Sequence, residues 1–170
     1  MKKTAGFTLI ELMVVVAIAA ILLTTALPSF LNMVQNNLIT DQTNELVLAL
    51  NQTRTEAVKN GRTATVCISS NKTACTGTNW NNGWLVWVDK NNDGTMASSE
   101  IVSVLPTPNP TISITATGSI TGLAFTPVGS KAISGDSVFT LSTANCSGDA
   151  KRAITVSNSG RINVQKQSCP

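Results

Sequence analysis

The sequence contains no histidine and no tyrosine, and charged residues make up only 12% of its 170 positions. That charged share is about half of the roughly 25% found in ordinary globular domains. Without histidine there is no imidazole to act as general base, zinc ligand or pH-dependent charge. The serine and threonine hydroxyls therefore lack their usual activating base. We expect a protein that is not an enzyme.

The strongest positive signal is the apolar run from Phe7 to Leu27, which carries one charge, Glu11. About 20 such residues cross a bilayer as a helix. Lys2 and Lys3 precede the run and favour a cytoplasmic N-terminus. An ordinary secretory signal or a plain anchor are the alternatives, but the helical pattern continues beyond residues 24–26, where a secretory signal would end. An unpaired carboxylate in lipid costs at least about 2.5 kcal/mol, so Glu11 needs a partner.

Residues 2–12, Lys-Lys-Thr-Ala-Gly-Phe-Thr-Leu-Ile-Glu-Leu, resemble the class III signal of type IV pilins and type II secretion pseudopilins. The resemblance implies that a prepilin peptidase removes a leader of residues 1–6 by cutting between Gly6 and Phe7, and then methylates Phe7. It also implies that Glu11 pairs with the N-terminal amine of a neighbouring subunit. A buried carboxylate and a buried ammonium neutralise each other only in the assembled filament.

Residues 28–60 continue the helix with an amphipathic pattern, so we expect a transmembrane half over 7–27 and an amphipathic half over 28–60. Pilins commonly carry a proline where Pro28 falls, and it should kink or locally melt the helix. Gly61 is the expected C-cap. The apolar stripe predicted to contact the head consists of Leu31, Val34, Leu38, Leu46, Ala49, Leu50 and Ala57.

After Gly61 the sequence changes to short β-branched runs separated by Gly, Pro, Asn and Ser, which is typical of antiparallel sheets. We expect an α+β, pilin-like fold: a long N-terminal helix packed on a β-rich head domain at 61–170. The expected strands are Thr63–Ile68, Trp84–Val88, Ile101–Val104, Ile112–Ala116, Leu123–Phe125, Val138–Leu141, Ala153–Val156 and Ile162–Val164.

Two segments of the head, residues 83–101 and 158–162, resemble H-type pseudopilins and the FimT/FimU group of minor pilins. This resemblance implies a subunit present in few copies, near the filament tip. In pili such subunits help to start assembly, and in type II secretion systems they cap the pseudopilus.

The four cysteines, at positions 67, 75, 146 and 169, form no C-x-x-C pattern. An even number of cysteines in an exported chain indicates two disulfides, with three connectivities open. The pairing Cys67–Cys75 with Cys146–Cys169 closes the shortest loops and is the one we favour.

Residues 89–100 match the EF-hand calcium pattern, with Asp89, Asn91, Asp93 and Glu100 as the candidate ligands. An EF-hand needs flanking helices, whereas the segment before this loop reads as a strand. Loops rich in Asp, Asn and Gly also form turns without metal, because their side chains bind their own backbone. We therefore favour a structural turn and expect no cofactor, with calcium as the alternative.

DNA binding is a second alternative. FimT-type proteins that take up DNA carry Gly-Arg-x-Arg, and here Gly160 and Arg161 are followed by Asn163 in place of the second arginine. The mature chain would have 10 basic residues (12 less the two in the leader) against 9 acidic ones, so it is no polycation. Binding would need a local patch around Arg161, and the available residues are Lys131, Lys151, Arg152 and Lys166.

These observations predict a FimU-like minor pilin that promotes pilus assembly. Its expected location is the inner membrane, as a single-pass protein with a cytoplasmic N-terminus and a periplasmic head, and then the extracellular pilus. Expected partners are other major and minor pilins, the prepilin peptidase, the inner-membrane assembly platform and membrane lipid. A FimT-like DNA receptor and a type II secretion pseudopilus tip subunit are the alternatives.

Overall fold

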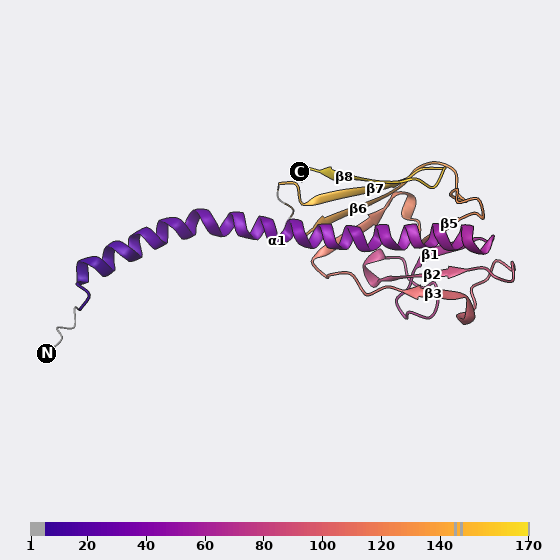
Figure 1. Ribbon diagram of the computed structural model, residues 1–170, viewed down its shortest axis with the longest axis horizontal. Helices are drawn as coiled ribbons and strands as arrows, with labels where there is room; N and C mark the ends of the chain where they lie inside the picture. Colours follow the sequence, from indigo (N-terminus) through magenta and orange to yellow (C-terminus); the bar gives the residue numbers. More distant parts are fainter. Residues whose placement is uncertain (1–5, 145, 147, 170) are drawn as a thin grey trace.

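The computed structural model describes residues 6–144, 146 and 148–169. One helix, α1 (Leu9–Asn60), extends far beyond a β-rich head that surrounds its C-terminal half (Figure 1). Thr8 caps the start of α1, and Gly61 ends it with a left-handed φ of 60° that L side chains rarely adopt. The predicted α+β, pilin-like architecture is confirmed, and so is the C-cap glycine.

The N-terminal half of α1 projects away from the head (Figure 1), and its large apolar side chains are exposed. By length and composition α1 is able to cross a membrane. The helix runs through position 28 without interruption and curves where it projects from the head (Figure 1), so the local melting considered for Pro28 does not occur. Leu31 and Val34 are exposed, which corrects the predicted contact stripe: the head begins to cover α1 only beyond them.

The head contains two four-stranded antiparallel sheets, with strand orders β3-β2-β1-β5 and β4-β6-β7-β8. All eight predicted strands are present: three have the predicted bounds, and the other five have ends shifted by one to three residues. Their bounds are β1 Ala64–Ile68, β2 Trp84–Val88, β3 Ile101–Val104, β4 Ile112–Ala116, β5 Gly122–Phe125, β6 Ser137–Thr143, β7 Lys151–Val156 and β8 Ile162–Gln167.

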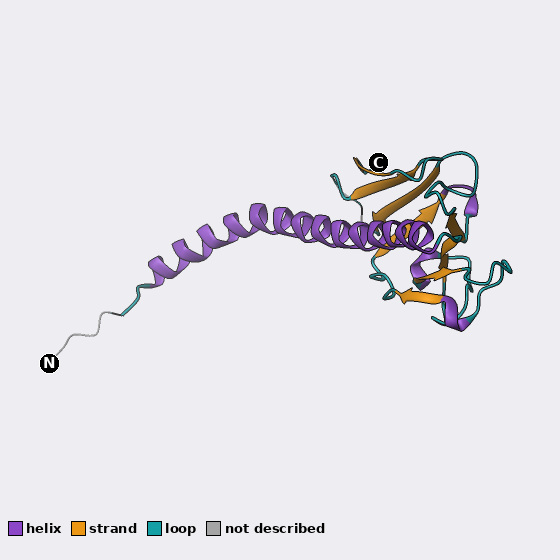
Figure 2. Ribbon diagram, turned by 45° about the vertical axis from the view of Figure 1, so that its right-hand side comes forward, coloured by secondary structure: helices purple, strands orange, loops and turns teal. Residues whose placement is uncertain are grey.

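The chain changes sheet three times, because β4 joins the second sheet, β5 returns to pair with β1, and β6 to β8 complete the second sheet. Strands β6 to β8 lie on one side of α1 and strands β1 to β3 on the other, an arrangement that holds in both views (Figures 1 and 2). Three short 3-10 turns, Trp80–Asn82, Ser98–Glu100 and Thr117–Ser119, lie in the connections.

One hydrophobic core joins α1 to the inner faces of both sheets. Leu46, Ala49 and Leu50 are fully buried in it, because three- and four-residue steps place them on one face of the helix. Trp80 packs edge-on against Phe139 with ring centroids 5.0 Å apart, and its indole nitrogen donates to the carbonyl of Ile120. All three tryptophans are buried in the head.

Candidate functional site

The N-terminal end of α1 holds the residues predicted to be processed and to guide assembly. Gly6 and Phe7 are exposed, and the phenyl side chain of Phe7 makes no contact with the head. Thr8 and Glu11 form a capping box: the carboxylate of Glu11 accepts from the backbone N–H and the hydroxyl of Thr8, while Thr8 Oγ1 accepts from the Glu11 N–H. The carboxylate thus has a partner within its own chain.

The capping box was not part of the expectation for Glu11, although the Thr-x-x-Glu spacing signals it. In this arrangement the carboxylate caps the N-terminal end of the helix, where it accepts from the Thr8 backbone N–H, which has no partner within the helix. A neighbouring subunit's amine would compete with Thr8 for Oε2, the carboxylate oxygen that accepts both bonds from Thr8.

The exposed apolar surface of this half of α1 is continuous. Its large side chains lie on every face of the helix, so no single stripe faces a missing neighbour. A helix that is apolar all round belongs in lipid or inside a bundle of other helices. The exposed large hydrophobics are Phe7, Leu9, Ile10, Leu12, Met13, Val14, Val15, Val16, Ile18, Ile21, Leu22, Leu23, Leu27, Phe30, Leu31, Met33 and Val34.

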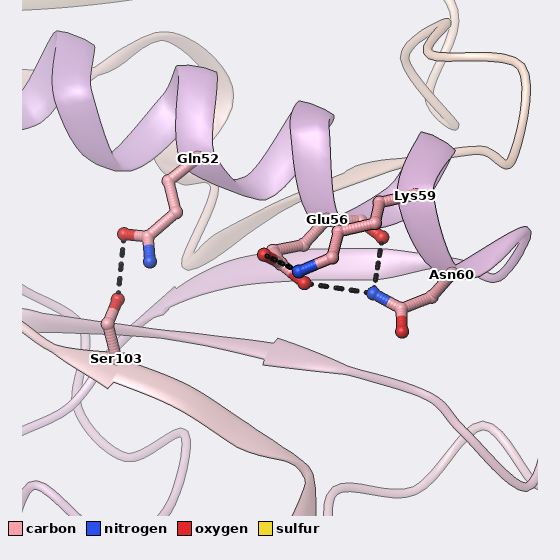
Figure 3. A network of polar contacts seen from close by, with 5 residues as sticks. All are labelled: Gln52, Glu56, Lys59, Asn60 and Ser103. Carbon is pink, nitrogen blue, oxygen red and sulfur yellow. Dashed lines mark hydrogen bonds and ion pairs between the residues drawn. The ribbon is translucent and has the colours of Figure 1, made fainter.

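Polar contacts tie the other half of α1 to the head. The hydroxyl of Ser103 on β3 donates to Gln52 Oε1 at 2.9 Å (Figure 3). One turn further, Glu56 forms an ion pair of 3.5 Å with Lys59 and accepts a hydrogen bond from Asn60 (Figure 3). Both contacts of Glu56 lie within α1, so the bond between Gln52 and Ser103 is the one of these three that joins the helix to the first sheet.

Arg54 links the helix to both loops at the far end of the head. Its Nε donates to the Gly129 carbonyl at 2.9 Å, and its guanidinium also reaches the Ser159 carbonyl. The backbone of Gly160 packs directly against the Gly129 carbonyl, since a Cβ built at position 160 would lie 2.1 Å from the Gly129 oxygen. The glycine is required by packing as well as by its φ of 75°. Sequence reasoning missed Arg54, since nothing local indicates its long-range partners.

The basic patch around Arg161 that the DNA-binding alternative requires does not form. Arg161 is exposed at the tight turn between β7 and β8, where its backbone pairs with Ser157. Lys151, Arg152 and Lys166 lie at the opposite end of the same two strands. Lys166 lies five residue steps along the strand from Arg161, which is about 17 Å. Closeness in the sequence was misleading, because Arg161 lies in the turn of the hairpin and the other three cations lie at the far ends of its two strands.

Lys131 is also unavailable to a surface patch. It is 6% exposed, and its ammonium donates to the Gly135 carbonyl and to the hydroxyl of Ser137. Burial lowers the pKa of Lys131, and the nearby charge of Asp136 opposes that shift in part.

The loop matched by the calcium pattern is closed by its own hydrogen bonds. Both carboxylate oxygens of Asp89 accept backbone N–H groups, from Asp93 and Gly94. Both oxygens of Glu100 are used in the same way, by backbone N–H groups that include those of Lys90 and Ala97.

Asp93 is the exposed member of this loop. Its side chain accepts from the hydroxyl and the N–H of Thr95, and the hydroxyl bond is the main cause of the lowered pKa of Asp93. Within the described residues no group of three or more His, Cys, Asp or Glu is placed to hold a metal ion. The geometry agrees with a structural turn between β2 and β3.

Two disulfides are present, Cys67–Cys75 and Cys146–Cys169, which is the pairing that closes the shortest loops. The first anchors the long loop after β1. The second joins the segment before β7 to the end of the chain after β8, and so holds the edge strand of the second sheet in place.

A long exposed apolar helix joined to a disulfide-linked β head defines a pilin-like subunit. A family model described as Type II transport protein GspH matches residues 42–160, and a model of the prokaryotic N-terminal methylation motif matches residues 1–27. The chain belongs to the family of the type II transport protein GspH. The resemblance to H-type pseudopilins, stated from the head segments, is therefore confirmed.

Two crystal structures of the type IV minor pilin FimU from Pseudomonas aeruginosa strain PAO1 have a similar fold. In space group P21 the identity is 22% and the TM-score 0.57, and the match covers 78% of this chain and 92% of FimU. In space group P65 the values are 23% and 0.54, with 74% and 91% covered. A comparison with curated proteins gave no match.

Proposed function

We propose that this chain is a minor pilin of a type IV pilus and acts in filament assembly. The observation that carries the proposal is the exposed apolar half of α1, which is joined to a head whose own core is complete. Such a helix needs lipid before assembly and neighbouring helices afterwards. The match to the N-terminal methylation motif supports processing between Gly6 and Phe7 by the prepilin peptidase.

In this proposal residues 1–6 are the leader, residues 7–27 span the inner membrane, residues 28–60 connect to the head, and residues 61–170 form the periplasmic head. Glu11 exchanges its bonds to Thr8 for the N-terminal amine of a neighbouring subunit. In this proposal the subunit lies near the filament tip and contacts other pilins and the assembly platform, and its likeness to the minor pilin FimU supports that placement. The protein has a structural role and performs no catalysis.

The experiment is a count of surface pili in a strain deleted for this gene, with retraction disabled. Loss of most pili supports a role in starting or capping the fibre, whereas a normal number of pili overturns it. Complementation with the intact gene must restore the number, because that excludes an effect on neighbouring genes.

A second candidate is a pseudopilus subunit of a type II secretion system, which the description of the matching family favours. The same deletion strain separates the two. Under this alternative, secreted enzymes accumulate in the periplasm while the number of pili stays normal.

The separation of Arg161 from the other cations gives DNA binding no comparable support. A mobility-shift assay with the purified full-length protein tests it. We expect no shift that depends on Arg161, so Arg161→Ala should behave as wild type.

A further inference from the structure

Two cations lie side by side near the point where α1 leaves the head. Arg152 on β7 and Lys166 on β8 are direct cross-strand partners, so their side chains project from the same face of the sheet. Like charges directly opposite each other destabilise a sheet. Among the described residues the one ion pair is Glu56–Lys59, so neither cation is paired with a carboxylate. Neither positive charge is therefore neutralised by an ion pair.

Arg152 carries the more costly of the two charges, because its side chain is only 5% exposed. Its guanidinium donates to the carbonyls of Asp149 and Lys151 and, at 3.4 Å, to the hydroxyl of Thr40 on α1. All three acceptors are uncharged. A buried charge that is hydrogen-bonded but has no counter-charge is costly, and an anion that binds beside it removes part of that cost.

Both cations line a groove of about 610 Å³ between α1 and the edge strand β8. The helix side of the groove adds the amides of Asn36 and Asn37, and Asp149 contributes one carboxylate. Two cations against one carboxylate leave a net positive charge. A guanidinium, an ammonium and neutral amides together suit a phosphate group, which offers several strong acceptor oxygens.

The groove lies at the level where a membrane would end. The exposed large apolar side chains of α1 continue to Val34, and Met33 already lines the groove. From Leu27, the last residue of the proposed span, to Met33 the helix rises about 9 Å, which is close to the thickness of the headgroup region on one side of a bilayer. Strand β8 ends beside the exit of α1 from the head (Figure 1). The phosphate layer of the bilayer is therefore the anion nearest to the groove.

We propose that this groove binds the phosphate of an anionic phospholipid, from the periplasmic leaflet, while the subunit is held in the inner membrane. This inference rests on the membrane-held form in the proposed function. The lipid fixes the tilt and rotation of the head above the membrane and leaves when the subunit is extracted into a filament.

The test measures lipid bound to the purified full-length protein by native mass spectrometry, in detergent containing equal amounts of phosphatidylglycerol and phosphatidylcholine. Wild type should retain phosphatidylglycerol preferentially. Lys166→Gln should weaken that binding about fivefold, since a cation near an anionic lipid surface contributes about 1 kcal/mol. Arg152→Gln combined with Lys166→Gln should abolish the preference. Lys166 is exposed, so its single variant gives the answer even where the buried arginine is needed for folding.

Arg161→Gln is the matched control, because it removes one cation from the other end of the same hairpin and should leave the preference intact. Equal retention of both lipids by wild type overturns the inference, and so does an unchanged preference in Lys166→Gln. Competition by inorganic phosphate at the same concentration would show a site for free anions instead of lipid. Vesicle flotation checks the membrane-held form separately, because failure to float contradicts that form whatever the groove does.

Discussion

The two halves of α1 are built from similar apolar residues but lie in opposite environments. Leu46 and Leu50 are fully buried between the two sheets, whereas Leu23 is 62% exposed and Leu27 55% exposed. The head therefore completes its own packing with one half of the helix and leaves the other half without a partner in the chain. We therefore expect substitutions in the C-terminal half of α1 to affect the folding of the head. Substitutions in the N-terminal half should affect association with other subunits.

The largest expected difference between the two halves of α1 is in the effect of replacing one leucine in each half by alanine. Leu50→Ala leaves a cavity in the core and should lower the free energy of unfolding of the head by about 3 kcal/mol. Leu23→Ala should change it by less than about 0.5 kcal/mol, as for other exposed sites. Urea unfolding of the full-length protein in detergent, followed by tryptophan fluorescence, reports on the head alone, because all three tryptophans lie there. Equal effects of the two substitutions would refute the division.

The second prediction concerns the far end of the head. Gly160→Ala forces a Cβ against the Gly129 carbonyl in a left-handed backbone, and should cost about 2–3 kcal/mol. Gly135→Ala is the matched control: its φ is 83°, but a Cβ there meets nothing within 4 Å, so it should cost only about 1 kcal/mol. The same unfolding measurement compares them, and a Gly135 variant as unstable as the Gly160 variant would argue against the packing explanation.

The hydrogen bond between Gln52 and Ser103 tests how firmly the helix is joined to the first sheet. Ser103→Ala should cost about 1 kcal/mol, because it removes the hydroxyl that donates to the Gln52 amide. Ser113→Ala, on the exposed face of β4, should be nearly neutral. In a double-mutant cycle with Gln52→Ala the two substitutions should be non-additive; strict additivity would mean that this contact contributes nothing.

The smallest expected effect is a pH dependence in the loop between β2 and β3. The pKa of Asp93 is lowered in the folded state, first by the Thr95 hydroxyl. Its ionised form therefore stabilises the fold above the unfolded pKa of about 3.9, and that contribution disappears as pH falls through the folded value.

Thr95→Val should raise the pKa of Asp93 and reduce stability near neutral pH, with the two unfolding profiles converging in acid. Carboxyl NMR titration gives the pKa directly. Thr78→Val, at another exposed threonine, should leave both quantities unchanged.

Local patterns in the sequence were sufficient to predict the helix and all eight strands. In Trp84–Val88 the side chains alternate as expected for a strand: Trp84 and Val86 lie in the main core, and Leu85 and Trp87 lie on the other face with Cys67. Such patterns report on which face of a strand is buried, and burial is what the sequence encodes most directly.

Long-range pairing was not predictable in the same way. No local signal assigns β4 to one sheet and β5 to the other, because that choice depends on register across the whole head. The patch around Arg161 failed for the same reason: residues close in sequence were separated by a hairpin. The groove that holds Arg152 and Lys166 exists only because α1 passes beside β8.

A role of Glu11 in filament assembly is tested by the fraction of the protein found in pili sheared from the cell surface, compared between wild type and Glu11→Ala. The account predicts that the variant stays in the inner membrane with a normally folded head, because the head does not contact Glu11. Glu56→Ala, at the opposite end of α1, should enter pili as wild type does. Recovery of Glu11→Ala in sheared pili at the wild-type fraction would contradict the account.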